Sequence, residues 1–311
     1  MSKNILITGA SGMVGEALIK SLSKQGHNLN ILTTQKNRVQ SNVNCNIYYW
    51  NPINNEINLE SLDGIEYIIN LAGAPITQRW TKFTKKKIIN SRVKSLSILL
   101  KTIRENKLTS VKHLISASAI GIYPSSITNY YDENYDQFDN SSFLSSVVKK
   151  WESAAMEYSS EGIKVSILRI GIVLGLNGGA LPQIIKPIKM YSGAVLSNGN
   201  QWQSWIHIED LVSIFLHLLE TKVIGIFNAV APNPVRQSEL TFEIAKLTKR
   251  PILLPNIHKS LLKLVFGEMC SVVVDSQLVC SKKIKNTGFN FKFQYIHPAL
   301  KSLIQSNNQQ K

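Results

Sequence analysis

The sequence predicts an α/β protein with a doubly wound parallel sheet and a second, smaller C-terminal domain. Short apolar runs alternate with helix-length segments from residue 5 to about residue 175, which is the pattern of a parallel sheet with helical crossovers. Beyond that point glycines and prolines become frequent and the alternation ends. The 311 residues, 44% of them hydrophobic, can fill one large core or two joined cores.

Each strand of the first domain is expected at a short apolar run, because continuous runs of this length are typical of strands that are buried on both faces. The expected strands are 5–7, 29–33, 47–49, 67–73, 111–116 and 165–170. Helices are expected between them, since parallel strands need crossover connections. The expected helices end near Lys24, run from about 84 to 105, and run from about 143 to 160 after a polar loop at 125–142.

The later part of the chain is expected to leave the first domain and return to it through segments 207–220 and 227–231. We therefore assign residues 1–175 and about 207–231 to the first domain. Residues of about 176–206 and 232–305 form the smaller domain, and 306–311 form a polar tail.

The turn after the first strand reads TGASGMVG at residues 8–15 and holds three glycines. Gly9 allows a tight turn, Gly12 lets the backbone approach a phosphate, and Gly15 lets the next helix pack close to the strand. A strand that turns through such glycines into a helix presents backbone N–H groups to a pyrophosphate. The pattern predicts a dinucleotide cofactor, and the alternative is a glycine-rich turn without a ligand.

The segment after the second strand indicates which dinucleotide this is. Sites for NAD usually carry an acidic residue about twenty positions after the glycines, where it binds the ribose 2′-hydroxyl. No Asp or Glu occurs from residue 17 to residue 55. Thr33, Thr34, Lys36 and Arg38 lie there instead, and hydroxyls and cations favour a 2′-phosphate. The pattern predicts NADP, with solvated loop charges as the alternative for the two cations.

Composition argues against several function classes. The formal charge is +15, but the lysines are scattered and not interleaved with aromatic residues, which argues against a nucleic-acid partner. No run of 18 apolar residues occurs and the chain enters a strand at once, so we expect no membrane span, no signal peptide and a cytoplasmic location. Three cysteines without ligand spacing predict no metal site.

Several segments resemble the extended short-chain dehydrogenase/reductases: the glycine loop, Asn70-Leu71-Ala72-Gly73 after a strand, and Ser116-Ala117-Ser118-Ala119 before Tyr123. Within that superfamily the chain is more similar to an atypical group of NADP-binding epimerase-family proteins, often named nucleotide-sugar epimerases or cell-division inhibitors. The segments that carry this closer likeness include Arg79-Trp80-Thr81, Ser91-Arg92, Lys150-Trp151-Glu152, Leu168-Arg169-Ile170-Gly171 and Ser204-Trp205-Ile206-His207. The resemblance spans nearly the whole chain and implies a small family-specific domain at roughly residues 250 to 300.

The resemblance also implies a set of cofactor contacts. At the pyrophosphate these are Gly9, Ser11, Gly12, Met13 and Gly15; at the adenosine ribose and its phosphate, Thr33, Thr34, Lys36 and Arg38; and at the nicotinamide side, Leu71, Ala72 and Gly73. Ser116 has either the cofactor amide or the backbone as its partner.

The catalytic pair of the superfamily is absent. Its active members use a Tyr for proton transfer and a Lys four residues later, whose charge lowers the pKa of the Tyr. None of the ten tyrosines here has a Lys at that distance, and the corresponding positions fall near Leu144 and Val148. Tyr123 and Ser118 are the remaining candidates for proton transfer. The alternative for Tyr123 is a packed aromatic with a satisfied hydroxyl.

Four residues are candidates for the substrate side. Arg79 and Trp80 follow the strand at 67–73, and Gln201 and His207 flank the return to the first domain. Helix capping is the alternative for His207. Two functions remain open: an NADP-dependent oxidoreductase or epimerase acting on an unknown small molecule, and a non-catalytic NADP-binding sensor or scaffold.

Overall fold

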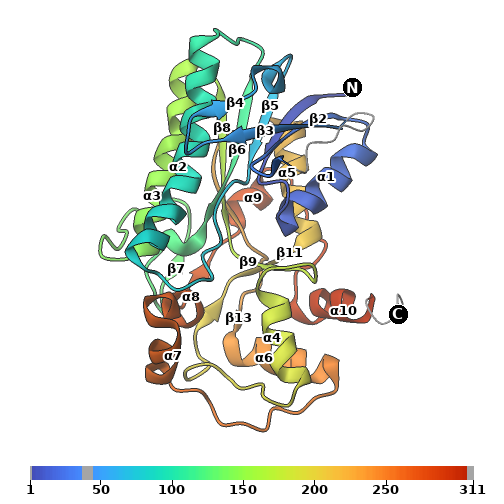
Figure 1. The fold of residues 1–311 in the computed structure, drawn as a ribbon. Coiled ribbons are helices and arrows are strands. Elements are labelled where there is room, and N and C mark those ends of the chain that lie inside the picture. The colour runs from blue at the N-terminus through green and yellow to red at the C-terminus, as the bar shows by residue number, and fades with distance from the viewer. Residues whose placement is uncertain (1, 37–44, 307–311) are drawn as a thin grey trace.

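The computed structural model describes residues 2–36 and 45–306 and contains one large sheet with helices on both faces (Figure 1). The strands lie in the order β12-β8-β6-β5-β1-β2-β3-β4, and all pairs are parallel except β3 with β4. Their bounds are β1 (Asn4–Thr8), β2 (Asn28–Thr33), β3 (Cys45–Asn51), β4 (Glu56–Ile57), β5 (Tyr67–Asn70), β6 (His113–Ala119), β8 (Lys164–Ile170) and β12 (Gly225–Ala229). The doubly wound parallel sheet predicted from the sequence is confirmed.

Two helices pack on each face of this sheet. Figure 1 shows α1 (Met13–Lys24) and α5 (Ile208–Thr221) on one side, and α2 (Lys82–Glu105) and α3 (Phe143–Met156) on the other. Alternate side chains of β1 point to opposite faces of the sheet. Ile5 and Ile7 pack with α1 and α5, and Leu6 packs with α2 and α3. The strands are therefore buried on both faces, as their continuous apolar runs predicted.

The strand order reverses beside β1, because the chain runs from β1 to β2 and β3 on one side and from β5 to β6 and β8 on the other. At such a point the connections after neighbouring strands leave in opposite directions, and the space between their carboxyl ends is where this class of fold binds ligands. The connection after β1 is the glycine loop, and the connection after β5 begins at Leu71.

A second hydrophobic core lies below the sheet in the view of Figure 1, around α4 (Ala180–Lys189), α6 (Gln237–Thr248) and α10 (Ile296–Ser306). Buried residues such as Trp205, Leu240 and Leu300 fill it. The remaining short elements are β7 (Tyr130–Tyr131), β9 (Ile172–Leu174), β10 (Trp202–Gln203), β11 (Trp205–His207), β13 (Val235–Arg236), β14 (Leu278–Val279), α7 (Lys259–Phe266), α8 (Ser271–Val274) and α9 (Lys282–Asn286).

The boundaries of two predicted strands differ from expectation. The strand expected at 67–73 ends at Asn70, because the backbone N–H of Ala72 turns toward the Thr8 hydroxyl. The strand expected at 111–116 is β6, which starts later and continues to Ala119 through its pairing with β8.

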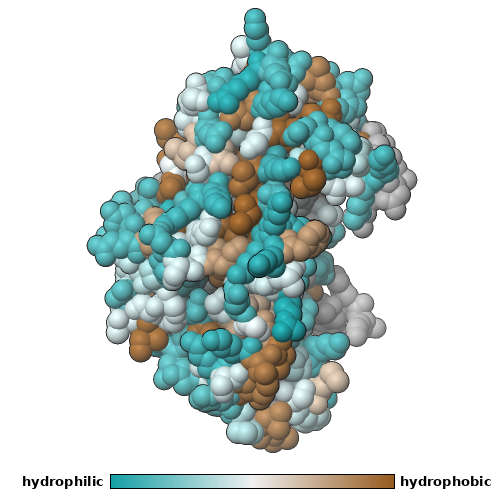
Figure 2. Space-filling view, turned by 60° about the vertical axis from the view of Figure 1, so that its left-hand side comes forward, coloured by the Kyte–Doolittle hydropathy of each residue, from teal (hydrophilic) through white to brown (hydrophobic). Residues whose placement is uncertain are grey.

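The surface is mixed. Figure 2 shows hydrophilic side chains over most of one face, with a larger group of hydrophobic side chains toward its lower end. Exposed apolar residues in the C-terminal region include Leu253, Leu264 and Val265. Within the described ranges, no helix combines the length and apolar character that a membrane crossing requires.

Candidate functional site

The glycine loop joins β1 to α1 at the point where the strand order reverses. Gly9 has a φ of +70°, and a Cβ there would lie 2.5 Å from the carbonyl carbon and oxygen of Leu71. A Cβ at Gly15 would lie 2.6 Å from the carbonyl oxygen of Gly9. Both positions therefore require glycine, one for its conformation and both for the close approach of backbone segments.

Gly12 differs from the other two glycines, because a Cβ there would meet only the carbonyl oxygen of Gly9, at an ordinary 3.5 Å. The fold itself leaves space beyond Gly12. Gly12 is also the N-cap of α1, and no side chain caps this helix end. The N–H groups of the first turn are thus available to an anion, and the exposed Ser11 lies at the same loop. A pyrophosphate fits this arrangement.

A row of three polar side chains ties the neighbouring strands together beside the loop. Thr8 of β1, Asn70 of β5 and Ser116 of β6 are register partners and have no exposed surface. The Thr8 hydroxyl donates to Asn70 Oδ1 at 2.7 Å, and Asn70 Nδ2 donates to Ser116 Oγ at 3.3 Å. Thr8 Oγ1 also accepts the N–H groups of Leu71 and Ala72, both at 3.2 Å. The row fixes the loop after β5 against the glycine turn.

This row also gives the position of four predicted cofactor residues. The Ser116 hydroxyl is committed to Asn70 and to the carbonyl oxygen of Ala117, so its partners lie within the protein. Leu71 is half-buried and Ala72 is buried, whereas Gly73, near the start of the loop, is exposed.

The predicted ribose-phosphate residues follow β2. Thr33 is half-buried, and Thr34 and Lys36 are exposed. Thr33 Oγ1 accepts the N–H of Gln35 at 3.1 Å, which shapes the turn, and the Lys36 ammonium lies 4.9 Å from the centre of the Tyr49 ring. Arg38 lies outside the described residues.

A glycine-rich segment that leads into the second core covers Met13. A Cβ at Gly175 would lie 2.6 Å from Met13 Sδ, and one at Gly179 would lie 3.0 Å from Met13 Cε. The segment 175–179 therefore packs directly on the first helical residue after the loop. The sequence had indicated these glycines only as a sign of a new domain.

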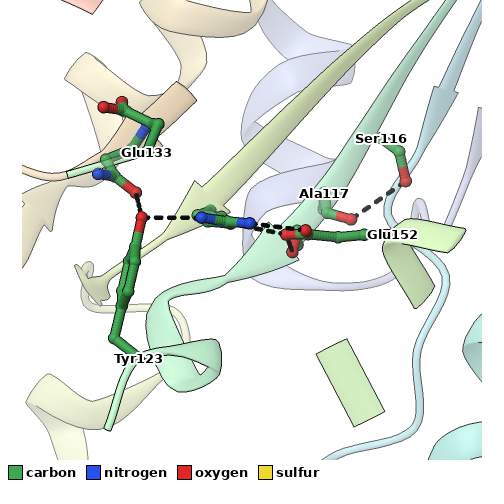
Figure 3. A network of polar contacts seen from close by, with 8 residues as sticks. Ser116, Ala117, Tyr123, Glu133 and Glu152 are labelled. Carbon is green, nitrogen blue, oxygen red and sulfur yellow. Dashed lines mark hydrogen bonds and ion pairs between the residues drawn. The ribbon is translucent and has the colours of Figure 1, made fainter. Parts of the chain in front are cut away.

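Tyr123 lies in a buried network with Arg169 and Glu152 (Figure 3). Its hydroxyl donates to Asn228 Oδ1 at 2.8 Å and accepts from Arg169 Nη1 at 2.9 Å. Arg169 Nε and Nη2 each donate to one oxygen of Glu152 at 2.9 Å. Figure 3 shows Tyr123 and Glu152 on opposite sides of the guanidinium. Although burial disfavours the Arg169 charge, its hydrogen bonds and attraction to Glu152 raise its pKa.

This geometry argues against Tyr123 as the group that transfers a proton to a ligand. The side chain is 2% exposed, and its hydroxyl is already used as donor and as acceptor. Burial raises the pKa of Tyr123 to about 12, although Arg169 and Asn228 oppose the shift. A general acid or base at neutral pH needs a pKa much closer to 7. The alternative considered from the sequence, a packed aromatic with a satisfied hydroxyl, describes what the structure contains.

Ser118 belongs to the same network. It is 3% exposed, and its hydroxyl donates to Glu152 Oε1 at 2.6 Å. The hydroxyl therefore stabilises the ion pair, and the geometry argues against proton exchange with a ligand. The structure brings both catalytic candidates together, but in the interior of the protein.

The two substrate-side candidates after β5, Arg79 and Trp80, differ in their exposure to solvent. Arg79 is exposed. Trp80 is 8% exposed, and its Nε1 donates to the carbonyl oxygen of Ile76 at 2.9 Å. Its ring packs edge-on against Phe143 at 4.8 Å between ring centres. Trp80 thus anchors the loop to α3 instead of forming an open cleft wall.

The other two substrate-side candidates, His207 and Gln201, are both buried. His207 Nδ1 accepts the N–H of Glu209 at 3.1 Å and so caps α5, and its ring stacks on Phe293. Burial lowers the pKa of His207 to about 4. Gln201 is 3% exposed, and its Nε2 donates to the carbonyl oxygen of Leu196 at 3.0 Å. These contacts argue for structural roles at both positions.

The Glu152–Arg169 pair was not predicted from the sequence, although both residues lie in segments that carry the family likeness. The usable signal was an ionic residue at a buried position of each element: Glu152 among the buried residues of α3 and Arg169 among the buried positions of β8. Such residues are buried only when they are paired.

Comparison with known proteins supplies the family. Residues 5–229 match the NAD dependent epimerase/dehydratase family. The chain belongs to this family. Residues 259–303 match a second family described as a domain of unknown function, DUF1731, which agrees with the family-specific domain expected at roughly 250 to 300.

Two curated relatives align along almost the whole chain. An epimerase family protein SDR39U1 homolog, chloroplastic, from Arabidopsis thaliana is 34% identical and covers 97% of this chain and 86% of the relative. Epimerase family protein SSP1921 from Staphylococcus saprophyticus is 36% identical and covers 97% and 99%.

Solved structures share the fold. Human epimerase family protein SDR39U1 with NADPH has a TM-score of 0.84 and 26% identity, covering 97% of this chain and 99% of the human chain. A nucleoside-diphosphate sugar epimerase from Corynebacterium glutamicum has a TM-score of 0.77 and 26% identity, covering 100% of this chain and 61% of the other. MoeE5 in complex with UDP-glucose and NAD, at 18% identity and a TM-score of 0.80, supports the fold alone.

Proposed function

We propose that this protein binds NADP(H) at the carboxyl edge of the sheet and acts as an oxidoreductase or epimerase on a small molecule. One observation carries the proposal: the turn through Gly9 and Gly12 leaves both uncapped N–H groups and open space at the start of α1. The human relative with NADPH supports it. A bound nicotinamide would supply hydride chemistry, and this chain would hold and orient it through the loops after β1, β2 and β5.

The preference for NADP over NAD rests on the segment after β2. Residues 33–38 carry hydroxyls, amides and two cations, and no acidic residue lies between positions 16 and 56 to repel a 2′-phosphate. Lys36 is exposed, and the Tyr49 ring lies beneath its ammonium group, which keeps the charge near the end of the strand. A phosphate at this position would gain a charge-assisted contact that a ribose hydroxyl lacks.

Calorimetry with NADPH and NADH tests the cofactor proposal. We expect tighter binding of NADPH, and we expect Lys36→Met to weaken NADPH binding about fivefold, the effect of losing one exposed charge contact, while NADH binding is unchanged. Lys24→Met is the matched control, because it removes the same charge at the far end of α1. Tighter binding of NADH by the unmodified protein would contradict the preference for NADP.

A second candidate function is cofactor binding without turnover, as in a sensor or scaffold. It is favoured by the committed hydroxyl of Tyr123 and by the apolar residues Leu144 and Val148 near the positions of the missing pair. NADPH oxidation measured across aldehydes, ketones, quinones and nucleotide sugars separates the two. Tight binding of NADPH without oxidation by any class supports the second candidate.

A further inference from the structure

A guanidinium lies beside the exposed Gly73, near the start of the loop after β5. Arg92 projects from α2, and a Cβ at Gly73 would lie 2.9 Å from Arg92 Cζ. Gly73 follows Ala72, whose N–H is held by Thr8 beside the glycine turn. The Arg92 side chain therefore lies at the same carboxyl edge of the sheet as the proposed cofactor site, and the lack of a side chain at Gly73 makes room for it.

Among the residues that the structure describes, only one of the three nitrogens of this guanidinium has a hydrogen-bond partner. Arg92 Nη1 donates to the carbonyl oxygens of Ala74 at 3.1 Å and Ile88 at 3.0 Å. Within residues 2–36 and 45–306, Nε and Nη2 have no hydrogen-bond partner, and no carboxylate pairs with the charge. Neither nitrogen belongs to the fully buried polar atoms that lack a partner, and Arg92 is half-buried as a residue, so this edge of the guanidinium is not fully sealed from solvent.

The surroundings hold the guanidinium in place without neutralising it. Its Cζ lies 5.0 Å from the centre of the Trp151 ring, a cation–π contact that fixes the plane of the group. Burial lowers the pKa of Arg92 to about 10, so the group stays charged at neutral pH, and no neighbouring charge contributes to that shift. The buried guanidinium of Arg169, by contrast, is paired with both oxygens of Glu152. The charge of the half-buried Arg92 is incompletely solvated, and an anionic ligand would compensate it.

We propose that Arg92 binds a carboxylate of the small-molecule substrate through its free Nε and Nη2 edge. That edge presents two parallel N–H groups whose spacing matches the two oxygens of a carboxylate. One guanidinium supplies a single positive charge, which suits a singly charged carboxylate better than a doubly charged phosphate. The assignment of the ligand as substrate rests on the proposed function, which places the cofactor at the neighbouring loops.

The test compares carboxylates with their uncharged amides. Acetate and acetamide, benzoate and benzamide, and succinate and succinamide are titrated into the protein with and without NADPH, and binding is followed by calorimetry or ligand-observed NMR. We expect at least one carboxylate to bind about tenfold more tightly than its amide, as for a hydrogen-bonded charged pair. Arg92→Met should abolish this difference and Arg92→Lys should retain part of it. Lys87→Met, which removes an exposed charge from the same helix, should leave it unchanged.

Several results would overturn the proposal. Equal affinity of the unmodified protein for every carboxylate and its amide would do so without any variant, even if Arg92→Met failed to fold. Loss of NADPH binding in a folded Arg92→Met protein would assign Arg92 to the cofactor instead. Failure of the unmodified protein to bind NADPH would contradict the proposed function separately, because the carboxylate comparison is also made without the cofactor.

Discussion

Replacing Tyr123 by Phe removes one hydroxyl and keeps the ring. The stack on Tyr131, with ring centres 5.2 Å apart and 12° between planes, is compatible with either residue. The substitution removes the donor to Asn228 Oδ1 and the acceptor for Arg169 Nη1. Asn228 and Arg169 are each at most 3% exposed, so water cannot readily replace the lost hydroxyl. A buried polar group without a partner costs about 1–3 kcal/mol, so two such groups with some relaxation should lower the free energy of unfolding by about 2–3 kcal/mol.

Urea unfolding followed by far-UV circular dichroism measures this change. Tyr295→Phe is the control, since Tyr295 is 63% exposed and its substitution should alter the free energy of unfolding by less than about 0.5 kcal/mol. NADPH affinity of Tyr123→Phe should stay within twofold of the original, because the hydroxyl does not reach the surface.

The opposite pattern would refute this reasoning. If Tyr123→Phe unfolded at the original urea concentration but lost NADPH binding or turnover, the hydroxyl would have to face a ligand. The buried network would then be a wrong description of the site, and Tyr123 would return as a candidate for proton transfer.

Two further predictions concern buried charge. Glu152→Gln leaves Arg169 without its counter-charge and should lower the free energy of unfolding by about 3–5 kcal/mol. The control is Glu105→Gln in an exposed ion pair, which should change that free energy by less than about 0.5 kcal/mol. Equal urea midpoints for the two variants would contradict this prediction. Burial lowers the pKa of His207 and of His113 to about 4, so both are neutral in the folded state and protonated in the unfolded state below about pH 6.5. The free energy of unfolding should therefore fall as the pH is lowered from about 6.5 to 4, and His207→Asn, which keeps a capping acceptor, should flatten that slope in urea unfolding at several pH values.

The sheet could be predicted because its signals are local. The run Ile5-Leu6-Ile7 is apolar on both faces, and Gly9 and Gly15 are required by contacts within a short stretch of chain and with one neighbouring loop. The end of β5 could not be predicted in this way. It depends on the hydroxyl of Thr8, which is more than 60 residues away and accepts the N–H of Ala72.

The roles of the polar candidates depended on contacts still more distant in the sequence. Tyr123 is satisfied by Asn228, 105 residues later, and by Arg169, so no local pattern could distinguish a buried hydroxyl from one that faces a ligand. His207 carried a local capping signal in the acidic residues that follow it, and that alternative describes its contacts in the structure. The sequence could not predict that Arg92 Nε and Nη2 lack hydrogen-bond partners, because this depends on which groups the fold places around the guanidinium.

The packing of segment 175–179 on Met13 has a kinetic consequence. Anything bound at the start of α1 lies beside a piece of chain that continues into the second core. A dinucleotide bound there would contact this segment, and in many proteins the opening of such a segment limits ligand release. The residence time of the cofactor would then report how often the segment lifts, and two variants with the same affinity could differ widely in how long they hold it.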